Sequence, residues 1–499
     1  MTPSFGTSGL RGLVTALTPD LVAGHVTAFA RACPMGTGLF VGRDLRPSSP
    51  GLAAVVVQAA QAAGLAVTDC GALPTPALAL AALQAGAAAV MVTGSHIPAD
   101  RNGLKFYTPL GEITKADETA LLAALGTAPG AAPPGPAVAV NDRAGADYVA
   151  RYVGAFGPGA LAGWRVGVYS HSAVGRDLLI EALAALGAGV VDLGRSDIFV
   201  PVDTEAVDPA TRARLRAWAA AGDMAAIVST DGDGDRPLMA DATGRIVPGD
   251  VLGQIAAAAL GAGVVVTPVS SNSGAESRFG DVIRTRIGSP HVIAAMERAM
   301  AQPMAQPMAQ PMAQPMAQPM AQPMAQPMAQ PMAQPMAQPG ARVVGYEANG
   351  GFLLGFDAAG PAGPLPALMT RDSLLPLIVA LVAAKAAGGL ALRVAAEPAR
   401  FTASGRLAGV PTARSAALVA ALTADAGARA AFLAPLDGTE ADMDLTDGLR
   451  LGLRDGRILH LRPSGNAPEL RLYTEAADPA AAEALLDAGL AALAARLQA

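Results

Sequence analysis

Cysteine is scarce in this sequence, and its scarcity excludes whole classes of site. Cys33 and Cys70 are the two cysteines among 499 residues, which is too few for a disulfide framework or a paired Cys-x-x-Cys metal site. Such usage is typical of a reducing compartment. The segment MTPSFGTSGLRG at 1–12 also lacks the basic stretch and apolar run of a secretory signal peptide. We therefore expect a cytoplasmic protein.

Aromatic residues and positive charge are also in short supply. Phe, Trp and Tyr make up 4% of the chain, and the formal net charge is −6 at pH 7. Few rings are available to stack on bases, and no excess of positive charge attracts a polyanion. We expect no nucleic-acid partner. An anionic small molecule would have to be bound by a local group of basic residues.

Long uninterrupted apolar runs are missing as well, although hydrophobic residues reach 52%. Much of the excess is alanine, and the runs are broken by Gly, Pro, Gln or Ser. The uncharged stretch 251–275 contains Gln254, Pro268 and several serines. This pattern predicts a helix followed by a buried strand rather than a membrane-spanning helix, so no membrane partner is expected.

Short apolar runs alternate with Ala/Leu-rich helical patterns along the chain. LFVGRD at 39–44 is followed by LAAVVVQAAQAAG, and WRVGVYS at 164–170 by GRDLLIEALAALGAG. Strands and helices at this spacing are typical of βαβ units and of parallel or mixed sheets with helices on both faces. The predicted fold class is α/β. Ligand sites in such folds lie at the carboxyl ends of strands.

The chain is too long for a single hydrophobic core, and its length predicts three or four units. A Pro/Gly/Ala-rich linker, APGAAPPGPA at 128–137, ends the first of them. The predicted units are 1–137, 138–246, 247–390 and 391–499.

A low-complexity segment interrupts the third unit. The unit MAQP occurs ten times without variation between residues 300 and 339. A proline at every fourth position costs about 3 kcal/mol each in a helix interior, so an ordinary helix is excluded. The period is also too short for a stacking repeat. We predict an extended or disordered surface loop, with a Pro-rich arm that binds a partner as the alternative.

Four segments carry candidate chemistry, and the first is AVMVTGSHIPADRNGLKFY at 89–107. An apolar strand leads to Ser95 in a turn with Gly94, His96 and Pro98, and Lys105 follows ten residues later. One interpretation is a serine turn beside a solvated histidine. The other is that Ser95 is a nucleophile or a phosphate carrier.

The second segment is IVSTDGDGDRP at 227–237, in which a strand ends in Asp231, Asp233 and Asp235. Three carboxylates on one loop repel one another unless a hard divalent cation binds between them. A calcium EF-hand loop is excluded, because its sixth and twelfth positions would be Arg236 and Ala242 instead of Gly and Glu. A solvated acidic turn remains the alternative to a Mg²⁺ site.

The third segment is VVGYEANGGFLLG at 343–355. A strand meets a Gly-rich loop that carries Glu347 and Asn349. A carboxylate and an amide together can bind sugar hydroxyls, which both donate and accept hydrogen bonds. Taken alone, the segment is equally consistent with a glycine-rich hairpin.

The fourth segment is LHLRPSGNAPELRLY at 459–473. Two strands flank a loop that holds Arg462, Ser464, Gly465 and Asn466, and Arg471 lies on the second strand. Arginine binds phosphate through paired hydrogen bonds, and exposed backbone N–H groups add donors. The segment predicts a phosphate-binding loop, with a surface turn bearing solvated arginines as the alternative.

Together these segments resemble the α-D-phosphohexomutase family, and they occur in the family's order. FGTSGLRG at 5–12 is similar to its N-terminal signature, TGSHIP to its active-serine loop, DGDGDRP to its metal loop, YEANGG to its sugar loop and RPSGNAPELRLY to its phosphate loop. The amino-acid sequence of the serine loop is most similar to that of the bacterial phosphomannomutase group.

The resemblance implies four α/β domains around a central cleft, three of them similar mixed-sheet sandwiches and the last a smaller α+β domain. In chain order they would carry the phosphoserine, the metal, the sugar and the phosphate. It also implies roles for individual residues. The catalytic set would be Ser95, Lys105, Arg11 and His96; the metal ligands Ser95, Asp231, Asp233 and Asp235; and the substrate-binding set Glu347, Asn349, Arg462, Ser464, Gly465, Asn466, Arg471 and Arg236.

The sequence departs from the family pattern at several positions. The family usually has Asn where this chain has Ile97, and many members have Ala where it has Gly94. Some mannose-specific members have a histidine where this chain has Gly351, which leaves Lys105 or His96 to take the acid/base role. A basic residue that the family tends to have in its third domain is replaced within IGSPH, at 287–291.

The function implied is a phosphohexomutase that interconverts hexose 1-phosphate and hexose 6-phosphate through a phosphoserine and a bisphosphate sugar. Mannose phosphate is the expected substrate, with glucose phosphate as a second. The implied cofactors are Mg²⁺ and a hexose 1,6-bisphosphate primer, and the protein would be a monomer or a homodimer. The alternatives are a phosphoglucosamine mutase, a metal-dependent sugar phosphatase and a catalytically silent binding protein.

Overall fold

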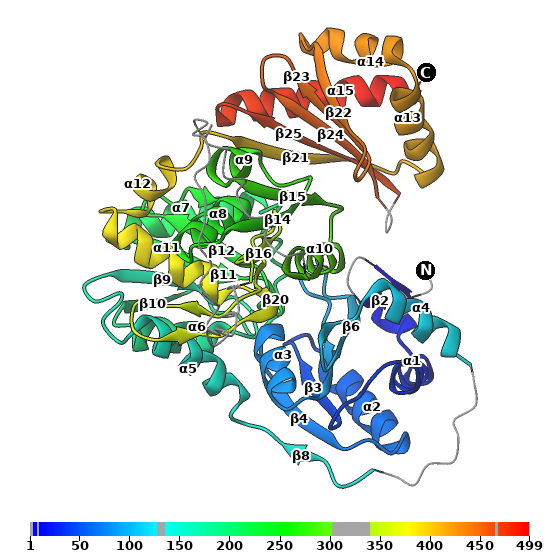
Figure 1. Cartoon of the computed structure of the whole chain (residues 1–499), viewed down its shortest axis with the longest axis vertical. Coiled ribbons are helices and arrows are strands. Elements are labelled where there is room, and N and C mark those ends of the chain that lie inside the picture. Colours follow the sequence, from blue (N-terminus) through cyan, green and yellow to red (C-terminus); the bar gives the residue numbers. More distant parts are fainter. Residues whose placement is uncertain (1–2, 7–8, 127–134, 302–339, 465–467, 499) are drawn as a thin grey trace, which may run out of the picture.

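The computed structural model describes residues 3–6, 9–126, 135–301, 340–464 and 468–498. They form helices and sheets that alternate along the chain, from an N-terminal unit at the lower right of Figure 1 to a C-terminal unit at the top. The α/β class predicted from the alternation of apolar strands and Ala/Leu-rich helices is confirmed.

The first sheet is mixed, with strands in the order β1-β2-β6-β5-β3-β4-β8 and β7 paired to β6. Successive residues of β5 face opposite sides, so Val90 packs with α1, α2 and α4, whereas Met91 packs with α3. The strands are β1 (Ser4–Phe5), β2 (Leu10–Leu13), β3 (Leu39–Arg43), β4 (Val67–Ala72), β5 (Ala88–Val92), β6 (Arg101–Thr108), β7 (Gly111–Glu112) and β8 (Ala139–Val140). The helices are α1 (Pro19–Ala32), α2 (Ser49–Ala62), α3 (Thr75–Gln84), α4 (Lys115–Ala124) and the 3-10 turn η1 (Val14–Ala16).

The second and third sheets repeat one strand pattern. Their orders are β10-β9-β11-β12-β13 and β15-β14-β16-β17-β20, and β18 and β19 pair separately. In each, a central strand is parallel to both neighbours, and an antiparallel hairpin follows. The strands are β9 (Arg165–Tyr169), β10 (Gly189–Leu193), β11 (Ala226–Thr230), β12 (Pro237–Asp241), β13 (Ile246–Val247), β14 (Val264–Pro268), β15 (Asp281–Thr285), β16 (Val343–Tyr346), β17 (Phe352–Leu354), β18 (Ala358–Ala359), β19 (Pro364–Leu365) and β20 (Leu368–Asp372). The helices are α5 (Ala144–Phe156), α6 (Arg176–Ala185), α7 (Pro209–Ala221), α8 (Gly249–Ala259), α9 (Gly274–Arg278), α10 (Ser289–Ala301), α11 (Leu374–Ala386) and α12 (Leu390–Ala395).

The last sheet is antiparallel throughout, in the order β21-β25-β24-β23-β22. Figure 1 shows it at the top, with α13, α14 and α15 beside it. The elements are β21 (Phe401–Ala408), α13 (Thr412–Ala424), α14 (Ala426–Leu433), η2 (Ala434–Leu436), β22 (Glu440–Asp444), β23 (Leu449–Leu453), β24 (Ile458–Pro463), β25 (Glu469–Ala476) and α15 (Pro479–Gln498).

Local sequence determines where several helices begin. Thr18 accepts the amide of Leu21 ahead of α1, and Asp208 accepts the amide of Thr211 ahead of α7. Thr114 and Asp117 form a reciprocal capping box at α4. These side chains satisfy N–H groups that a helix end leaves without a partner.

One hydrophobic core joins the first three units. It contains Leu78 of α3, Tyr152 of α5, Leu252 of α8 and Ile378 of α11. The C-terminal unit has a separate core, which includes Phe432 and Leu472. The facing sides of these helices are apolar, so amino-acid composition does not mark the boundary between the second and third units.

We propose four units, one for each large sheet among the described residues, with boundaries that differ from the predicted ones. β8 pairs with β4 of the first sheet, so that sheet extends past residue 137. β13 ends at residue 247, and α12 begins at residue 390 and ends at residue 395. The predicted boundaries at 137, 246 and 390 therefore each cut a sheet or an element and need to move toward the C-terminus by a few residues.

The repeat segment begins inside a helix. Met300 and Ala301 are the last residues of α10, and Met300 packs against the hydrophobic cluster of the third unit. The prediction of a non-helical segment is therefore wrong for Met300 and Ala301, the first two residues of the repeat. The predictions for 302–339, and for linker residues 128–134, concern residues outside the described part of the chain.

No single helix in the described part of the chain is long and apolar enough to cross a membrane. One bent pair of helices, Thr412–Ala424 with Ala426–Leu436, passes that test by length and composition alone.

A buried carboxylate links α5 to the third sheet. Asp372, at the end of β20, accepts hydrogen bonds from the hydroxyls of Tyr148 and Tyr152, and all three residues are buried. We expect Tyr148→Phe to lower the free energy of unfolding by about 1–3 kcal/mol, because a buried carboxylate loses a donor. Urea unfolding measures this, and the loss should shrink in an Asp372→Asn background. An equal loss in both backgrounds would contradict the linkage.

Candidate active site

Ser95 lies in the loop that follows β5 and is fully buried. Its backbone adopts the left-handed conformation, with φ of +55°, which costs free energy for a residue other than glycine. The Ser95 Oγ donates a hydrogen bond to Asp231 Oδ2 at 2.6 Å and lies 3.3 Å from His96 Nδ1. The hydroxyl of the first segment thus meets the acidic loop of the second directly.

Asp231, Asp233 and Asp235 form a buried carboxylate cluster after β11. One oxygen from each lies within 4.8 Å of the others. Among the described residues, Asp233 Oδ1 and Asp235 Oδ1 have no hydrogen-bond partner. Buried carboxylate oxygens without donors are costly unless a cation binds them. The donor set and its spacing fit a hard divalent cation such as Mg²⁺.

Lys105 on β6 and Thr75 at the start of α3 bind the Oδ2 oxygens of Asp233 and Asp235. The Lys105 Nζ lies 2.5 Å from Asp233 Oδ2 and 2.6 Å from Asp235 Oδ2, and the Thr75 hydroxyl donates to Asp233 at 2.5 Å. Burial alone would raise the pKa of Asp233, but the Lys105 charge and these hydrogen bonds lower it below its usual range. Burial and the two neighbouring aspartates raise the pKa of Asp231 well above its usual value.

His96 is held as a neutral acceptor. The Arg236 Nη1 lies 3.0 Å from His96 Nδ1, and since a guanidinium can only donate, this ring nitrogen must accept. Burial, with the charges of Arg236 and Arg11, lowers the pKa of His96 well below its usual value. Burial, Arg236 and Arg371 lower the pKa of Arg11 on β2 to about 10, while Asp233 and Asp235 oppose the change. Arg11 therefore lies among the charges of the cluster.

The loop that carries Glu347 and Asn349 connects β16 to β17 as an antiparallel hairpin. Both residues are buried. The Asn349 Oδ1 accepts the amide of Gly351 at 3.0 Å, and the Asn349 carbonyl accepts the hydroxyl of Thr204 at 3.0 Å. Part of the Asn349 amide group therefore shapes the loop itself, which the sequence pattern does not indicate.

Arg371 on β20 joins the hairpin to the acidic cluster. Its Nη2 lies 2.8 Å from Asp235 Oδ2, and its Nη1 lies 3.3 Å from Glu347 Oε2. A Cβ built on Gly351 would come within 2.9 Å of Arg371 Cδ. Arg371 therefore fills the space beside Gly351, the position at which the resemblance led us to look for a histidine.

Three arginines form a row across the last sheet. Arg471 on β25 is directly opposite Arg462 on β24 and Arg406 on β21, so the three side chains share one face. Asp447 binds Arg462, and Glu469 binds both Arg471 and Arg406. The positive charges exceed the negative ones in this row, which favours an anion such as phosphate.

Two carboxylates of the last unit accept hydrogen bonds from the third unit. The Asp447 carboxylate that binds Arg462 also accepts the amide of Ile287 at 3.0 Å. Glu475 accepts hydrogen bonds from the amide and the hydroxyl of Ser273. The arginine row is thus attached to the part of the chain that carries the sugar-loop hairpin.

Glu205, in the segment between β10 and α7, connects these groups electrostatically. Its carboxylate interacts with Arg236, Glu347 and Arg471, which come from three different units. Glu205 is exposed, yet the protein around it desolvates the carboxyl and, with the charge of Asp203, raises its pKa to about 7. A titratable acid therefore interacts electrostatically with the second unit's Arg236, with the hairpin and with the arginine row.

Comparison with known proteins decides the family. The model of alpha/beta/alpha domain I of phosphoglucomutase/phosphomannomutase matches residues 2–128, and that of the C-terminal domain matches residues 410–492. The phosphomannomutase of Sinorhizobium fredii is 45% identical over 509 residues, covering 99% of each chain. The chain belongs to the phosphoglucomutase/phosphomannomutase family. It is thus a phosphohexomutase, an intramolecular phosphotransferase, as the motifs predicted.

Further relatives agree with this assignment. The phosphomannomutase of Salmonella muenchen is 40% identical over 478 residues, covering 95% of this chain and 92% of its own. A solved phosphoglucomutase/phosphomannomutase family protein from Burkholderia thailandensis has a TM-score of 0.72 at 20% identity, covering 98% of this phosphohexomutase and 97% of that chain. The likeness to the solved structure concerns the fold.

The structure brings most of the predicted site residues of this phosphohexomutase together. Contacts or electrostatic interactions connect Ser95, His96, Lys105, Arg11, Arg236 and Glu347 with the acidic cluster. Arg462 and Arg471 lie on the separate last sheet, and buried Ser464 follows Arg462 at the end of β24. Gly465 and Asn466 lie outside the described residues.

Sequence reasoning missed several residues that contact the site or interact with it electrostatically. They are Thr75, Glu205, Arg371 and Arg406. Arg371, in the run LMTRD at 368–372, is a charge at the end of an apolar strand, and this signal was available in the sequence. The other three stand in ordinary helical, loop and strand patterns. Only their neighbours in space distinguish them.

Proposed function

We propose that this phosphohexomutase interconverts mannose 1-phosphate and mannose 6-phosphate, with glucose phosphates as a second substrate pair. The hydrogen bond from the Ser95 hydroxyl to the buried Asp231 carries the proposal, because it joins a nucleophile to a cation-binding cluster. The two most similar relatives described above are both phosphomannomutases, which favours mannose over glucosamine.

In this proposal Ser95 is the phosphoryl carrier. The bond from phosphorus to the Ser95 Oγ breaks as a bond from phosphorus to a sugar hydroxyl oxygen forms, and the hydroxyl proton leaves to a base. Reversal at the other end of the sugar returns a phosphoryl group to Ser95. A hexose 1,6-bisphosphate would prime the serine. Lys105 and Arg11 would offset negative charge on the transferring group.

Asp231, Asp233 and Asp235, with the Ser95 phosphate, would hold a Mg²⁺ ion. The ion would act as a Lewis acid and polarise the phosphoryl oxygens. Lys105 and Arg371 engage the Oδ2 atoms of Asp233 and Asp235, while the Oδ1 atoms of both lack donors among the described residues. The protein's own cations therefore orient the ligands without occupying every oxygen.

Glu347 and Asn349 would bind sugar hydroxyls, and the arginine row would bind the phosphate that is not reacting. Arg462, Arg471, Ser464, Gly465 and Asn466 are the proposed phosphate ligands. Arg371 holds one oxygen of Glu347, which fixes the carboxylate toward the site. A fixed phosphate and a set of hydroxyl contacts suit a sugar that must bind in two orientations.

A coupled assay tests this function. The purified protein would be given mannose, glucose and glucosamine 1-phosphates, each with and without Mg²⁺ and glucose 1,6-bisphosphate. We expect the highest kcat/KM for mannose phosphate and little turnover without Mg²⁺. A preference for glucosamine phosphate would contradict the substrate proposal, and release of inorganic phosphate without isomer formation would identify a phosphatase.

Glu205 predicts a pH dependence. Its pKa is raised to about 7, so as a proton acceptor it is ionised above that pH and protonated below it. We expect kcat/KM to fall as the pH drops through 7, and Glu205→Gln to lower kcat and to remove this limb. The titration of the substrate phosphate near pH 6 should remain in the variant. An unchanged profile in the variant would assign the limb to another group.

The matched control for this experiment is Glu276→Gln. Glu276 is an exposed acid on α9 that binds Arg284, and no proposed site residue contacts it in the described part of the chain. Its variant should keep the wild-type pH profile. The predicted cytoplasmic location, the absence of nucleic-acid and membrane partners, and the monomeric or dimeric state stay predictions.

A further inference from the structure

Arg46 is a buried arginine in the loop between β3 and α2, and the proposed chemistry does not use it. Its side chain is 1% exposed. A guanidinium has five N–H groups, and all five donate hydrogen bonds here. Nε donates to Asp44 Oδ2, Nη1 to the carbonyls of Pro98 and Arg101, and Nη2 to the carbonyls of Ser95 and Ile97, at distances of 2.6–3.1 Å.

Four of these acceptors belong to the backbone of the serine loop. The loop runs from the end of β5 to the start of β6, and Arg46 binds it at residues 95, 97, 98 and 101. The loop itself has few other backbone hydrogen bonds. Among them are those from Ile97 N to Gly94 O and from Arg101 N to Pro98 O. One side chain therefore supplies much of the framework for this loop.

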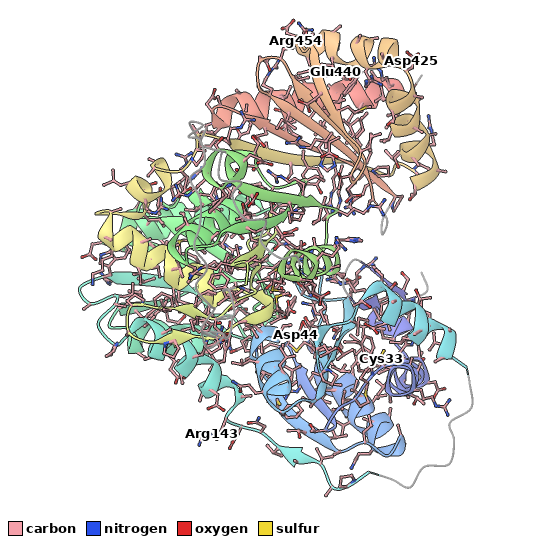
Figure 2. All side chains as sticks on the ribbon, viewed as in Figure 1. Cys33, Asp44, Arg143, Asp425, Glu440 and Arg454 are labelled. Atoms are coloured by element: carbon pink, nitrogen blue, oxygen red, sulfur yellow. The ribbon has the colours of Figure 1, made fainter. Side chains whose placement is uncertain are left out.

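Asp44 extends the same framework to the amide of Ser95. Its two oxygens accept from the Arg46 Nε, the Ser49 hydroxyl and the Thr93 hydroxyl. The Thr93 Oγ1 in turn accepts the Ser95 amide at 2.8 Å. Ser95 is thus held at its N–H through Thr93 and at its carbonyl by Arg46, which fixes the strained φ of +55°. Figure 2 shows Asp44 on the side of the first unit that faces the rest of the chain.

Phe199 connects this framework to the metal loop. The Arg46 guanidinium stacks on the Phe199 ring, 4.1 Å from its centroid, and Phe199 comes from the segment between β10 and α7. A Cβ built on Gly232 would lie 2.7 Å from the Ser95 carbonyl oxygen and 3.1 Å from Phe199. The serine loop, Arg46, Phe199 and the acidic loop are therefore packed without spare room.

Gly94 is explained by the same packing. A Cβ at this position would come within 2.6 Å of the Arg46 guanidinium carbon. An alanine there would displace the guanidinium unless the loop moved. The glycine, where many members of the family have alanine, thus matches the position of Arg46 in this chain.

We propose that Arg46 is a positioning residue that holds the Ser95 hydroxyl against the acidic cluster and couples the serine loop to the second unit through Phe199. The inference rests on the proposed role of Ser95 as the phosphoryl carrier. Arg46 touches neither the reacting atoms nor the sugar loop. Its loss should therefore slow phosphoryl transfer and leave sugar binding almost unchanged.

Arg46→Lys tests the proposal, because lysine keeps the charge but offers three donors instead of five. We expect kcat to fall by about 100-fold, as a displacement of about 1 Å can cause, while KM for mannose 1-phosphate stays within about threefold. Phosphorylation of Ser95 by glucose 1,6-bisphosphate should slow by the same factor as kcat. Intact-mass measurement during a single turnover gives this rate.

Arg429→Lys is the matched control. Arg429 is also buried and also binds backbone carbonyls, those of Leu422 and Thr423, together with Glu440. Figure 2 shows Glu440 in the C-terminal unit, at the far end from the first unit. This variant should lose thermal stability and keep kcat. Phe199→Leu, which removes the aromatic ring over the guanidinium and keeps Arg46 itself, should lower kcat by about fivefold.

The outcomes distinguish the positioning role of Arg46 from the phosphoryl-carrier role of Ser95. Wild-type kcat in folded Arg46→Lys and in Phe199→Leu overturns the positioning role, even if Ser95→Ala is inactive. Equal changes in KM and kcat overturn it as well, since they indicate a general disturbance. If Arg46→Lys does not fold, Phe199→Leu decides. Activity in Ser95→Ala would instead overturn the proposed function on which the inference rests.

Discussion

Replacing Ser95 by alanine is expected to lower kcat by roughly three to five orders of magnitude, because the variant lacks the atom that carries the phosphoryl group. The change is small in every other respect. Ser95 is buried, and its hydroxyl donates to Asp231 alone among the described carboxylates. The backbone bonds of residue 95 to Thr93 and Arg46 do not involve the removed oxygen.

The measurement combines turnover with the state of the serine. The coupled assay gives kcat, and intact mass after incubation with glucose 1,6-bisphosphate shows whether a phosphoryl group is retained. Ser415→Ala is the control, since Ser415 is equally buried and its hydroxyl donates to helix carbonyls in the C-terminal unit. Turnover within tenfold of wild type in Ser95→Ala would mean that another residue carries the phosphoryl group.

Replacing Asp231 by asparagine is expected to cost about three orders of magnitude in kcat, because it removes one of the negative charges that would bind the divalent ion. Asp231 also accepts the Ser95 hydroxyl and the amides of Asp235 and Arg236. Asparagine keeps the size of the side chain and one of its acceptors. The fold should therefore survive while the affinity for the divalent ion falls.

Mn²⁺ binding, followed by electron paramagnetic resonance, gives a readout that does not depend on activity. We expect the affinity of Asp231→Asn for Mn²⁺ to fall by at least about tenfold. Asp241→Asn is the control, because Asp241 is a buried aspartate at the end of β12 and binds Thr243 instead of the cluster. Undiminished Mn²⁺ binding by Asp231→Asn would show that these carboxylates do not form the cation site.

Asp231→Asn should leave the ion pairs around the acidic cluster intact. Lys105 and Arg371 neutralise part of the acidic cluster in the protein itself. Loss of the Asp231 charge leaves those ion pairs in place, since they involve Asp233 and Asp235. We therefore expect a defect in ion binding and phosphoryl transfer, with little change in the free energy of unfolding.

The chemistry of the site could be read from short stretches of sequence. Ser95 follows the apolar run at 89–92, and the three aspartates follow the run at 226–230. In an α/β fold both positions are at the carboxyl ends of strands, so local pattern was enough to expect them near a ligand. The structure then places the Ser95 hydroxyl on Asp231, across 136 positions of the chain.

The partners of these groups could not be read in the same way. Lys105 meets Asp233 across 128 positions, and Arg371 meets Asp235 from another sheet. Arg46 and Glu205 lie in loops whose sequences resemble ordinary polar turns. Their importance depends on which loops face each other, and no periodicity or motif in the chain encodes that arrangement.

The domain boundaries could not be read from the sequence for a related reason. The second and third units bury apolar helices against each other in the core that they share with the first unit, so amino-acid composition does not mark the boundary between them. The sequence by itself determined the fold class, the family and the chemical types at the site, because strand periodicity, turns and motifs act over a few residues. Only the tertiary structure decided which charges meet, since packing between sheets brings together residues that the chain keeps far apart.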